Sequence, residues 1–465
     1  MANHHKSTLK FDIEQFVYVK PSKPTPIGTL SLSTIDNICG MNGFCFVVHV
    51  YESPKDRKNS SQKDPALMIK EALSKALFYY YPLAGRIVKH ADGKLRVNCN
   101  NANGVPFVEA IANCNLSSLN YLDGSNTEIA KHLVLDLESE DEHGFQVYPM
   151  VVKVTKFLCG GFTIGLGTSH NIIDGSGTSQ FLQAIAEFVS GKNEPSVKPP
   201  AWEREKFVGS ITKQPLEFPM DKASAAVSPY LPTTKLVNAC FKVDNESIKR
   251  LKMSLMKEIN NDQNNNNTME ENFTSFECLA SYVWRARTRA LKLNSDGKVM
   301  LSIQVGLSKH FDPPLPKGYY GNTTLDAICV LTIREVNEKP LSHVAKMIKE
   351  AKRVVRTKEH IKRLMDTLET ENEEFDWDGR GACMCLTEWK HLGFSKNMDF
   401  GWTQPVNVVP APCGMFDKLG LCIFSSPSSL DPSMEGGSRI FVSLPNAAIP
   451  KFREEIEALS KYQAY

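Results

Sequence analysis

The chain has 465 residues, of which 42% are hydrophobic and 23% are charged, ordinary proportions for a globular protein. This length exceeds what one hydrophobic core usually organises, so we expect two domains. The 54 basic and 52 acidic residues leave a net charge of +2, which gives no long-range field to attract polyanions. We therefore expect no nucleic-acid partner and no membrane partner.

The twelve cysteines are scattered and mostly lie in apolar, strand-like context, as in "GFCFVVHV" and "AICVLTI". This pattern predicts reduced core thiols. No Cys-x-x-Cys pair occurs, and Cys383 and Cys385 are too closely spaced for a usual zinc site, so we predict no metal. The N-terminal residues lack a signal-peptide core, and no run approaches the about 18 apolar residues of a membrane span. We therefore expect a cytoplasmic protein.

Helix and strand signals alternate in the first third of the chain. Asp64-Pro65 is a good helix start, and apolar residues follow on one face until Pro82. Alternation around Asp92-Gly93 predicts a hairpin. Two strands are expected on either side of the "CGG" turn at 159–161, the second ending at His170, and helical spacing then continues to Gly191.

Residues 198–235 are rich in proline and weakly patterned, which predicts a crossover between two domains. Beyond it we expect a strand in "KLVNACFKV", a helix, and a loop in the polar run at 260–267. A helix follows with a capping box from Thr274 to Glu277. Strands in "GKVMLSIQV" and "LDAICVLTI", one helix over 341–369 and a terminal helix in "IPKFREEIEAL" complete a mixed α/β pattern.

The stretch "LGTSHNIIDGSGTSQF" places His170 at the end of a small-residue strand and Asp174 in the turn before a helix. Small residues leave space around the imidazole, and Gly175 allows a sharp turn. A neutral imidazole with a pKa near 6.5 is well suited to remove a proton from a hydroxyl group. The same spacing in "HLVLD", His132 to Asp136, lacks these features, which indicates a surface or edge pair. From the residues alone, a satisfied core histidine stays an alternative for His170.

Other candidate sites are weaker. Ser169 would point away from His170 on a strand, so a serine–histidine dyad is not expected. No phosphate-binding loop or dinucleotide fingerprint occurs. We interpret the arginines at 285, 287 and 289 as part of a solvated helix face.

Two motifs together carry a resemblance: "HNIIDG" at a strand-to-helix junction and "DFGW" at 399–402. In this order and separation they resemble the plant BAHD acyl-CoA-dependent acyltransferases. Further matches include "YYYPLAGR", "FLCGGFTIG", "KPPAWERE", "PPLPKGYYGN" and "VSLPNAAIPKF", so the resemblance covers essentially the whole chain. "LSTIDN", "FLCGGFTIG" and "KGYYGN" look most like the branch with the taxane acetyl- and benzoyltransferases and other alcohol acyltransferases.

The resemblance implies two similar-sized α/β domains of the chloramphenicol acetyltransferase type, with mixed sheets and a channel between them. We accordingly predict an N-terminal acyltransferase domain over 1–197, a linker over 198–235 and a C-terminal acyltransferase domain over 236–465. It also implies acyl-CoA as a co-substrate without a permanently bound cofactor, a small-molecule acceptor, and a monomer.

The resemblance also assigns roles. It implies that His170 is the general base and that Asp174 orients the loop of His170, usually through a salt bridge to an arginine. Asp399 is implied to be mainly structural, with a minor claim to a catalytic role. Gly175, Phe400, Gly401 and Trp402 complete the structural part of the two motifs.

The chain departs from the family pattern at two places. Gly306 and Ser308 stand where the family commonly has Asp-x-Arg, so the usual partner of Asp174 is missing, with Lys309 as one substitute. An unpaired buried carboxylate is costly, so another group must compensate. Thr403 and Gln404 replace the usual glycine and basic residue after "DFGW".

We therefore expect an O-acyltransferase that moves a benzoyl or acetyl group from CoA to a hydroxyl group of a plant specialised metabolite. An amine acceptor stays an alternative, because His170 would serve either nucleophile. The departures leave a non-catalytic, metabolite-binding member as a further alternative.

Overall fold

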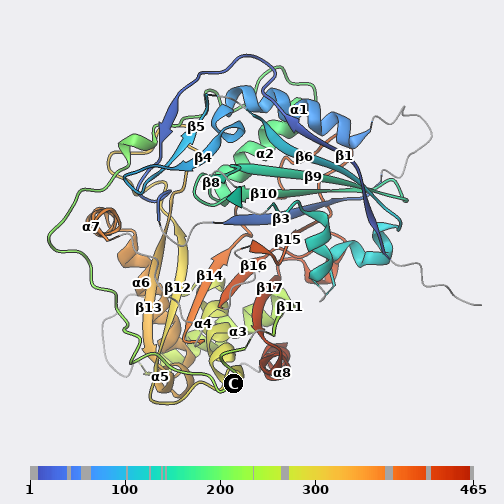
Figure 1. Cartoon of the computed structure of the whole chain (residues 1–465). Coiled ribbons are helices and arrows are strands. Elements are labelled where there is room, and N and C mark those ends of the chain that lie inside the picture. The colour runs from blue at the N-terminus through green and yellow to red at the C-terminus, as the bar shows by residue number, and fades with distance from the viewer. Residues whose placement is uncertain are drawn as a thin grey trace, which may run out of the picture.

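The computed structural model describes residues 9–38, 43–53, 64–100, 103–124, 127–137, 140–141, 144–233, 235–262, 272–371, 381–414 and 420–460. Its two large sheets lie one above the other in Figure 1, the first built mainly from the N-terminal half and the second from the C-terminal half. The two-domain α/β architecture expected from the sequence is therefore confirmed.

The first large sheet has six strands with both parallel and antiparallel neighbours. In spatial order they are β1 (Phe11–Val19), β6 (Val105–Ala112), β9 (Met150–Phe157), β10 (Phe162–Ser169), β3 (Phe44–Tyr51) and β15 (Asn407–Pro410). Central strand β10 is buried along its full length because it has a strand on each side. It can therefore hold the residue that follows it in a fixed place.

A smaller sheet lies beside the first one. Its strands, in order, are β2 (Thr29–Ser31), β5 (Leu95–Asn98), β4 (Arg86–Lys89), β8 (Gly144–Val147) and β7 (Glu140–Asp141). The hairpin predicted around Asp92-Gly93 is the β4–β5 pair, with Gly93 at a φ of +80°.

The second large sheet is also mixed, because β14 runs parallel to both of its neighbours. Its order is β11 (Leu236–Val243), β17 (Ser438–Pro445), β16 (Leu421–Ser425), β14 (Cys383–Glu388), β12 (Lys298–Gly306) and β13 (Thr324–Thr332).

Helices begin where the sequence supplies caps. Asp64 accepts hydrogen bonds from Ala66 N and Leu67 N at the start of α1, and the Thr274–Glu277 capping box opens α4. The described α-helices are α1 (Pro65–Tyr79), α2 (Gly175–Val189), α3 (Asn245–Asp262), α4 (Ser275–Ala290), α5 (Ile333–Glu338), α6 (Leu341–Val355), α7 (Lys358–Thr370) and α8 (Ile449–Ser460).

Two expectations about helices need correction. The single helix predicted over 341–369 is two helices, because Thr357 caps a new helix with its hydroxyl group on His360 N. The arginines at 285, 287 and 289 do not share a solvated face: Arg287 is buried and donates to the carbonyl of Gly381 at 2.8 Å. Most of the polar run at 260–267 lies outside the described residues.

Each large sheet has its own hydrophobic core. The first gathers mainly residues from the first 190 positions with residues of the segment 394–413, and the second gathers mainly residues from 207 to 459. Strand β15 comes from the second half but pairs with β3 of the first sheet. The domain boundaries at 197 and 235 stay a prediction. A boundary at either position assigns β15 to the C-terminal domain, although this strand belongs to the first sheet.

Candidate active site

His170 follows directly after the last residue of β10. Its backbone N donates to the carbonyl of Gly43 at 3.0 Å, which extends the β10–β3 ladder by one residue. The backbone that holds the imidazole is therefore fixed from the neighbouring strand.

The His170 imidazole is half-buried, and its Nδ1 atom is buried with no hydrogen-bond partner among the described residues. Burial lowers the pKa of His170 below its ordinary 6.5, while the carboxylates of Asp174 and Asp36 oppose this shift. The ring is accordingly neutral at physiological pH. With Nδ1 enclosed, Nε2 is the nitrogen left to accept a proton.

Asp174 is the N-cap of α2. Its Oδ1 accepts hydrogen bonds from Ser176 N and Gly177 N, both at 2.9 Å. Gly175 has an ordinary negative φ, so a sharp turn, expected from the sequence, does not explain why a glycine stands here. A side chain at 175 would instead place a Cβ 2.5 Å from Leu392 Cδ1.

Thr323 faces the other oxygen of Asp174. Its backbone N and its Oγ1 donate to Asp174 Oδ2 at 2.9 and 3.0 Å. Four donors thus satisfy a buried carboxylate without a cation. Lys309, the substitute considered from the sequence, is exposed and is not among the hydrogen-bond partners of Asp174, and Ser308 is exposed as well.

A second buried carboxylate, Asp36, holds the loop of His170 from outside. Asn322 Nδ2 donates to Asp36 Oδ1 and to the carbonyl of His170, both at 2.7 Å. Asn171 Nδ2 donates to the carbonyl of Asp36 at 2.9 Å. Because Asp36 and Asn322 come from different parts of the chain, the loop is held from two sides.

Asp36 also forms an ion pair with Arg204 of the crossover segment. Arg204 Nη1 lies 3.1 Å from Asp36 Oδ2, and both side chains are fully buried. The guanidinium stacks on Trp202 with its Cζ 3.9 Å from the ring centroid. In the sequence, "LSTIDN" and "KPPAWERE" were recognised only as family signatures. Asp36 and Arg204 lie 168 residues apart, and no local pattern indicates that they meet.

The "DFGW" segment packs on the first sheet at the opposite end of β10. Phe400 lies edge-on to Tyr51 with centroids 5.7 Å apart, and Trp402 lies edge-on to Phe162 at 4.9 Å. Gly401 has a φ of +86°, a conformation that favours glycine. Phe162 begins β10 and Ser169 ends it, about 23 Å apart at about 3.3 Å per residue.

Asp399 is exposed and accepts a hydrogen bond from Gly401 N at 2.8 Å, which shapes the turn. Gln404, one of the departures, accepts from Met398 N at 2.9 Å and closes the same turn. These contacts give both residues a local structural role.

Comparison with known proteins shows the family to which this chain belongs. The family model described as the Transferase family matches residues 9–459. The chain is a BAHD acyltransferase. A spermidine coumaroyl-CoA acyltransferase and a spermidine sinapoyl-CoA acyltransferase of Arabidopsis thaliana are each 38% identical to it. Both matches cover 99% of this chain, with 98% and 100% of the relatives. A taxadien-5-alpha-ol O-acetyltransferase of Taxus chinensis is 32% identical, with 98% of both chains covered.

Solved structures show the same BAHD fold. Vinorine synthase matches with a TM-score of 0.70 and 22% identity, over 97% of this chain and 98% of that one. TRI101 of F. sporotrichioides, solved with coenzyme A and T-2, matches with a TM-score of 0.72 and 13% identity, over 94% and 99%. The expectation of the two-domain acetyltransferase-like fold is confirmed.

BAHD enzymes use acyl-CoA as the co-substrate, in agreement with the expectation from the sequence. Within the described ranges, no group of three or more side chains could hold a metal ion. No helix in the described part of this BAHD chain is both long and apolar enough to cross a membrane.

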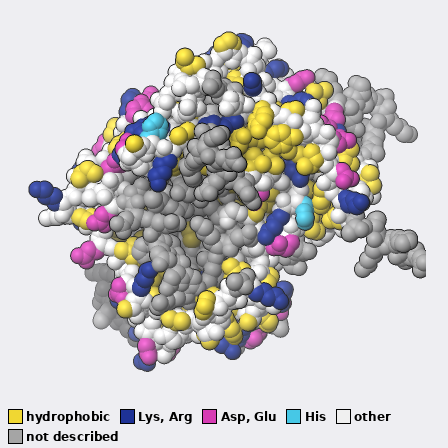
Figure 2. Space-filling model, in the orientation of Figure 1, with side chains coloured by type: hydrophobic (Ala, Val, Ile, Leu, Met, Phe, Trp, Pro, Cys, Tyr) yellow, Lys and Arg dark blue, Asp and Glu magenta, His cyan; other side chains and the backbone are white. Residues whose placement is uncertain are grey.

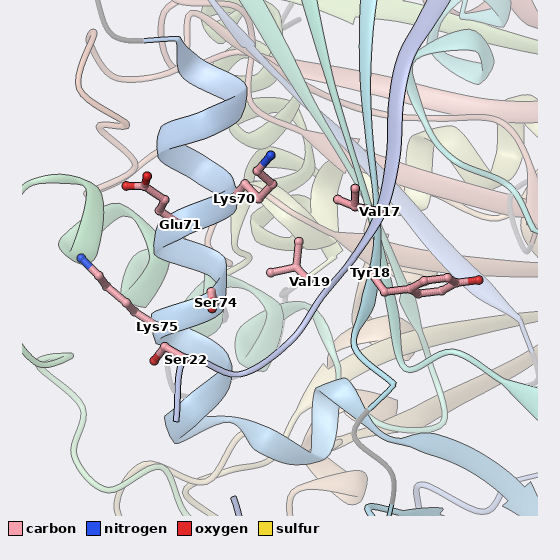
Figure 3. Close-up of a pocket in the computed structure, with 8 residues that line it drawn as sticks. All are labelled: Val17, Tyr18, Val19, Ser22, Lys70, Glu71, Ser74 and Lys75. Carbon is pink, nitrogen blue, oxygen red and sulfur yellow. The ribbon is translucent and has the colours of Figure 1, made fainter. Parts of the chain in front are cut away.

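An open groove of about 520 Å³ lies between β1 and α1 (Figure 3). Its lining residues are Val17, Tyr18, Val19, Ser22, Lys70, Glu71, Ser74 and Lys75. Hydrophobic side chains gather in the upper part of Figure 2, where Figure 1 draws α1 and β1. The groove contains none of the predicted site residues of this BAHD enzyme, so it is separate from the His170 site.

Proposed function

We propose that this chain transfers an aromatic acyl group from CoA to an amine of an aliphatic polyamine. The two relatives with 38% identity act, by their names, on spermidine with coumaroyl-CoA and sinapoyl-CoA. This choice takes up the amine alternative of the sequence, ahead of the alcohol acceptor favoured there. The supporting observation in the molecule is His170, whose pKa is lowered by burial and whose Nδ1 is enclosed.

The proposed reaction needs no covalent enzyme intermediate, because a thioester is already activated. The neutral amine attacks the thioester carbonyl carbon while His170 Nε2 takes its proton, and a tetrahedral intermediate forms. The carbon–sulfur bond then breaks, the amide is released, and the imidazolium returns the proton to the CoA sulfur. In this proposal Asp174 does not touch the substrate but fixes the loop of His170 through α2 and Thr323.

A second candidate is O-acyl transfer of a benzoyl or acetyl group to a hydroxyl group. Relatives of Taxus at 30–32% identity support it, including a 2-alpha-hydroxytaxane 2-O-benzoyltransferase of Taxus cuspidata. The same base would serve, since a hydroxyl group also surrenders one proton. We further propose that the enzyme works in the cytoplasm as a monomer.

The test is a donor-by-acceptor matrix read by mass spectrometry and by release of the CoA thiol. The donors are coumaroyl-CoA, sinapoyl-CoA, benzoyl-CoA and acetyl-CoA, and the acceptors are spermidine and a set of alcohols. Amides of spermidine that disappear in His170→Ala support the proposal. Esters formed from benzoyl-CoA or acetyl-CoA, without amides, would support the second candidate instead.

A further inference from the structure

Strand β13 presents an alternating row of half-buried side chains that includes Asp326. The residues between them, such as Leu325, Ala327 and Cys329, are buried in the second core, where α6 packs against β13. Side chains alternate between the two faces of a strand. Asp326 therefore stands on the face of the sheet that turns away from this helix.

The Asp326 carboxylate is hydrogen-bonded on one side only. Ser302 Oγ and Gln304 Nε2, both on the neighbouring strand β12, donate to Oδ1, and Oδ2 accepts no bond from the described residues. Within the described ranges, no lysine or arginine pairs with Asp326. Among the described residues, Oδ2 is also not one of the buried polar atoms that lack a partner, so this atom is not fully enclosed.

Removing a carboxylate from water without a cation is unfavourable, and burial accordingly raises the pKa of Asp326. Asp174 and Asp36 are also buried, but four donors bind Asp174, and Arg204 pairs with Asp36. Asp326 has only two donors on one oxygen. The missing interaction is one that a positively charged ligand could supply.

The position of Asp326 relates it to His170. Asn322, which donates to the carbonyl of His170, precedes Asp326 by four residues, and β13 begins between them at Thr324. Four residues of chain span at most about 14 Å, so the Cα atoms of Asn322 and Asp326 lie within this distance of each other.

Strand β3 of the first sheet lies near the face of the second sheet that carries Asp326. Gln304 Nε2 also lies 3.8 Å from Cys385 Sγ on β14, and Cys45 of β3 is near enough to help raise the pKa of Cys385. Cys45 pairs with Thr168, two residues before His170. A chain of neighbouring residues, Gln304, Cys385, Cys45 and Thr168, therefore leads from Asp326 to the end of β10 that carries His170.

We propose that Asp326 binds a protonated amine at the far end of the acceptor while another amine of the same molecule, deprotonated, meets His170. This inference rests on the proposed function and specifies its acceptor as an elongated diamine or polyamine. The low-dielectric surroundings strengthen the attraction between carboxylate and ammonium, and the open Oδ2 supplies the acceptor atom. A monoamine would leave Asp326 without its partner.

The first experiment compares Asp326→Asn with the wild type at a saturating concentration of coumaroyl-CoA. We expect the KM for spermidine to rise about 10- to 100-fold, the effect of one hydrogen bond to a charged group, with kcat changed less than threefold. The KM for octylamine should not change. Asp296→Asn is the matched control, because it removes the same charge from an exposed site beside the opposite end of β13.

The second experiment uses the wild type alone, so it still tests the inference if the Asp326→Asn variant does not fold. The KM for 1,8-diaminooctane should be at least tenfold lower than that for octylamine, which has the same chain with one amine. Equal KM values, or an equal effect of Asp326→Asn on both acceptors, would overturn the inference.

Calorimetric binding of spermidine without donor separates this inference from the proposed function. Binding to the wild type that weakens in Asp326→Asn, without any acylation, supports the subsite and refutes the proposed function. Acylation of spermidine with an equal KM in the wild type and in Asp326→Asn supports the proposed function and refutes the subsite.

Discussion

Thr323 donates two hydrogen bonds to Asp174, one from its backbone N at 2.9 Å and one from its Oγ1 at 3.0 Å. These bonds occupy the oxygen that α2 does not cap, where the family pattern leads one to expect an arginine. This threonine, which directly precedes β13, thereby joins the second sheet to the loop of His170. The absent arginine is therefore no argument against catalysis.

Replacing the proposed base should strongly reduce turnover. We expect His170→Ala to lower kcat by about 100- to 10,000-fold, the contribution of a general base. The measurement is the rate of CoA thiol release with a competent donor and acceptor. His132→Ala is the control, because His132 is exposed and stacks on Phe11; an equal loss in both variants would contradict the assignment.

The acidic limb of the rate should lie below pH 6.5. Burial lowers the pKa of His170, so the ring stays neutral at a lower pH than free histidine and loses its basic form only as the pH falls through the lowered value. Hydrolysis of acyl-CoA by water is the suitable readout, because water carries no titrating amine. A midpoint above 6.5 would show that the neighbouring carboxylates outweigh burial.

The Thr323 hydroxyl group should position His170. In Thr323→Val the buried Asp174 loses one donor, so we expect kcat to fall about tenfold with a smaller change in KM. Thr323→Ser keeps the donor and should retain most of the activity. Lys309→Ala should have no effect, since Lys309 is exposed; a loss there would revive the salt bridge considered from the sequence.

The Asp36–Arg204 pair should stabilise the fold through its burial. Asp36→Ala leaves the guanidinium without its charged partner, and we expect the free energy of unfolding to fall by about 3 to 5 kcal/mol. The double variant Asp36→Ala/Arg204→Met should lose less than the sum of the single variants. Denaturant unfolding measures both; additive losses would mean that the two side chains do not interact.

The "DFGW" segment should contribute stability rather than chemistry. Trp402→Ala removes the edge-on contact with Phe162 and should cost about 2 to 3 kcal/mol. Asp399→Asn keeps an oxygen that can accept from Gly401 N, so kcat should not change. A large loss of kcat in Asp399→Asn at normal stability would restore the catalytic reading of this residue.

Local sequence patterns predicted many of the helices and strands of this protein. The spacing around Asp64, Asp92-Gly93 and Thr274 gave correct elements, because caps and turns depend on residues within a few positions of each other. The small-residue strand before His170 likewise indicated its position at the end of β10. The helix break at Thr357 was missed, because the apolar spacing continues across it while the cap depends on one hydroxyl group.

Only the tertiary structure decided what surrounds the two carboxylates near His170. Thr323 lies 149 residues from Asp174, and Arg204 lies 168 residues from Asp36, distances over which no periodicity carries information. The burial of Arg287 was equally hidden, since a helix pattern does not say which carbonyl lies opposite. Chain folding brings such groups together, and the cost of leaving a buried charge or dipole unsatisfied determines which of them must meet.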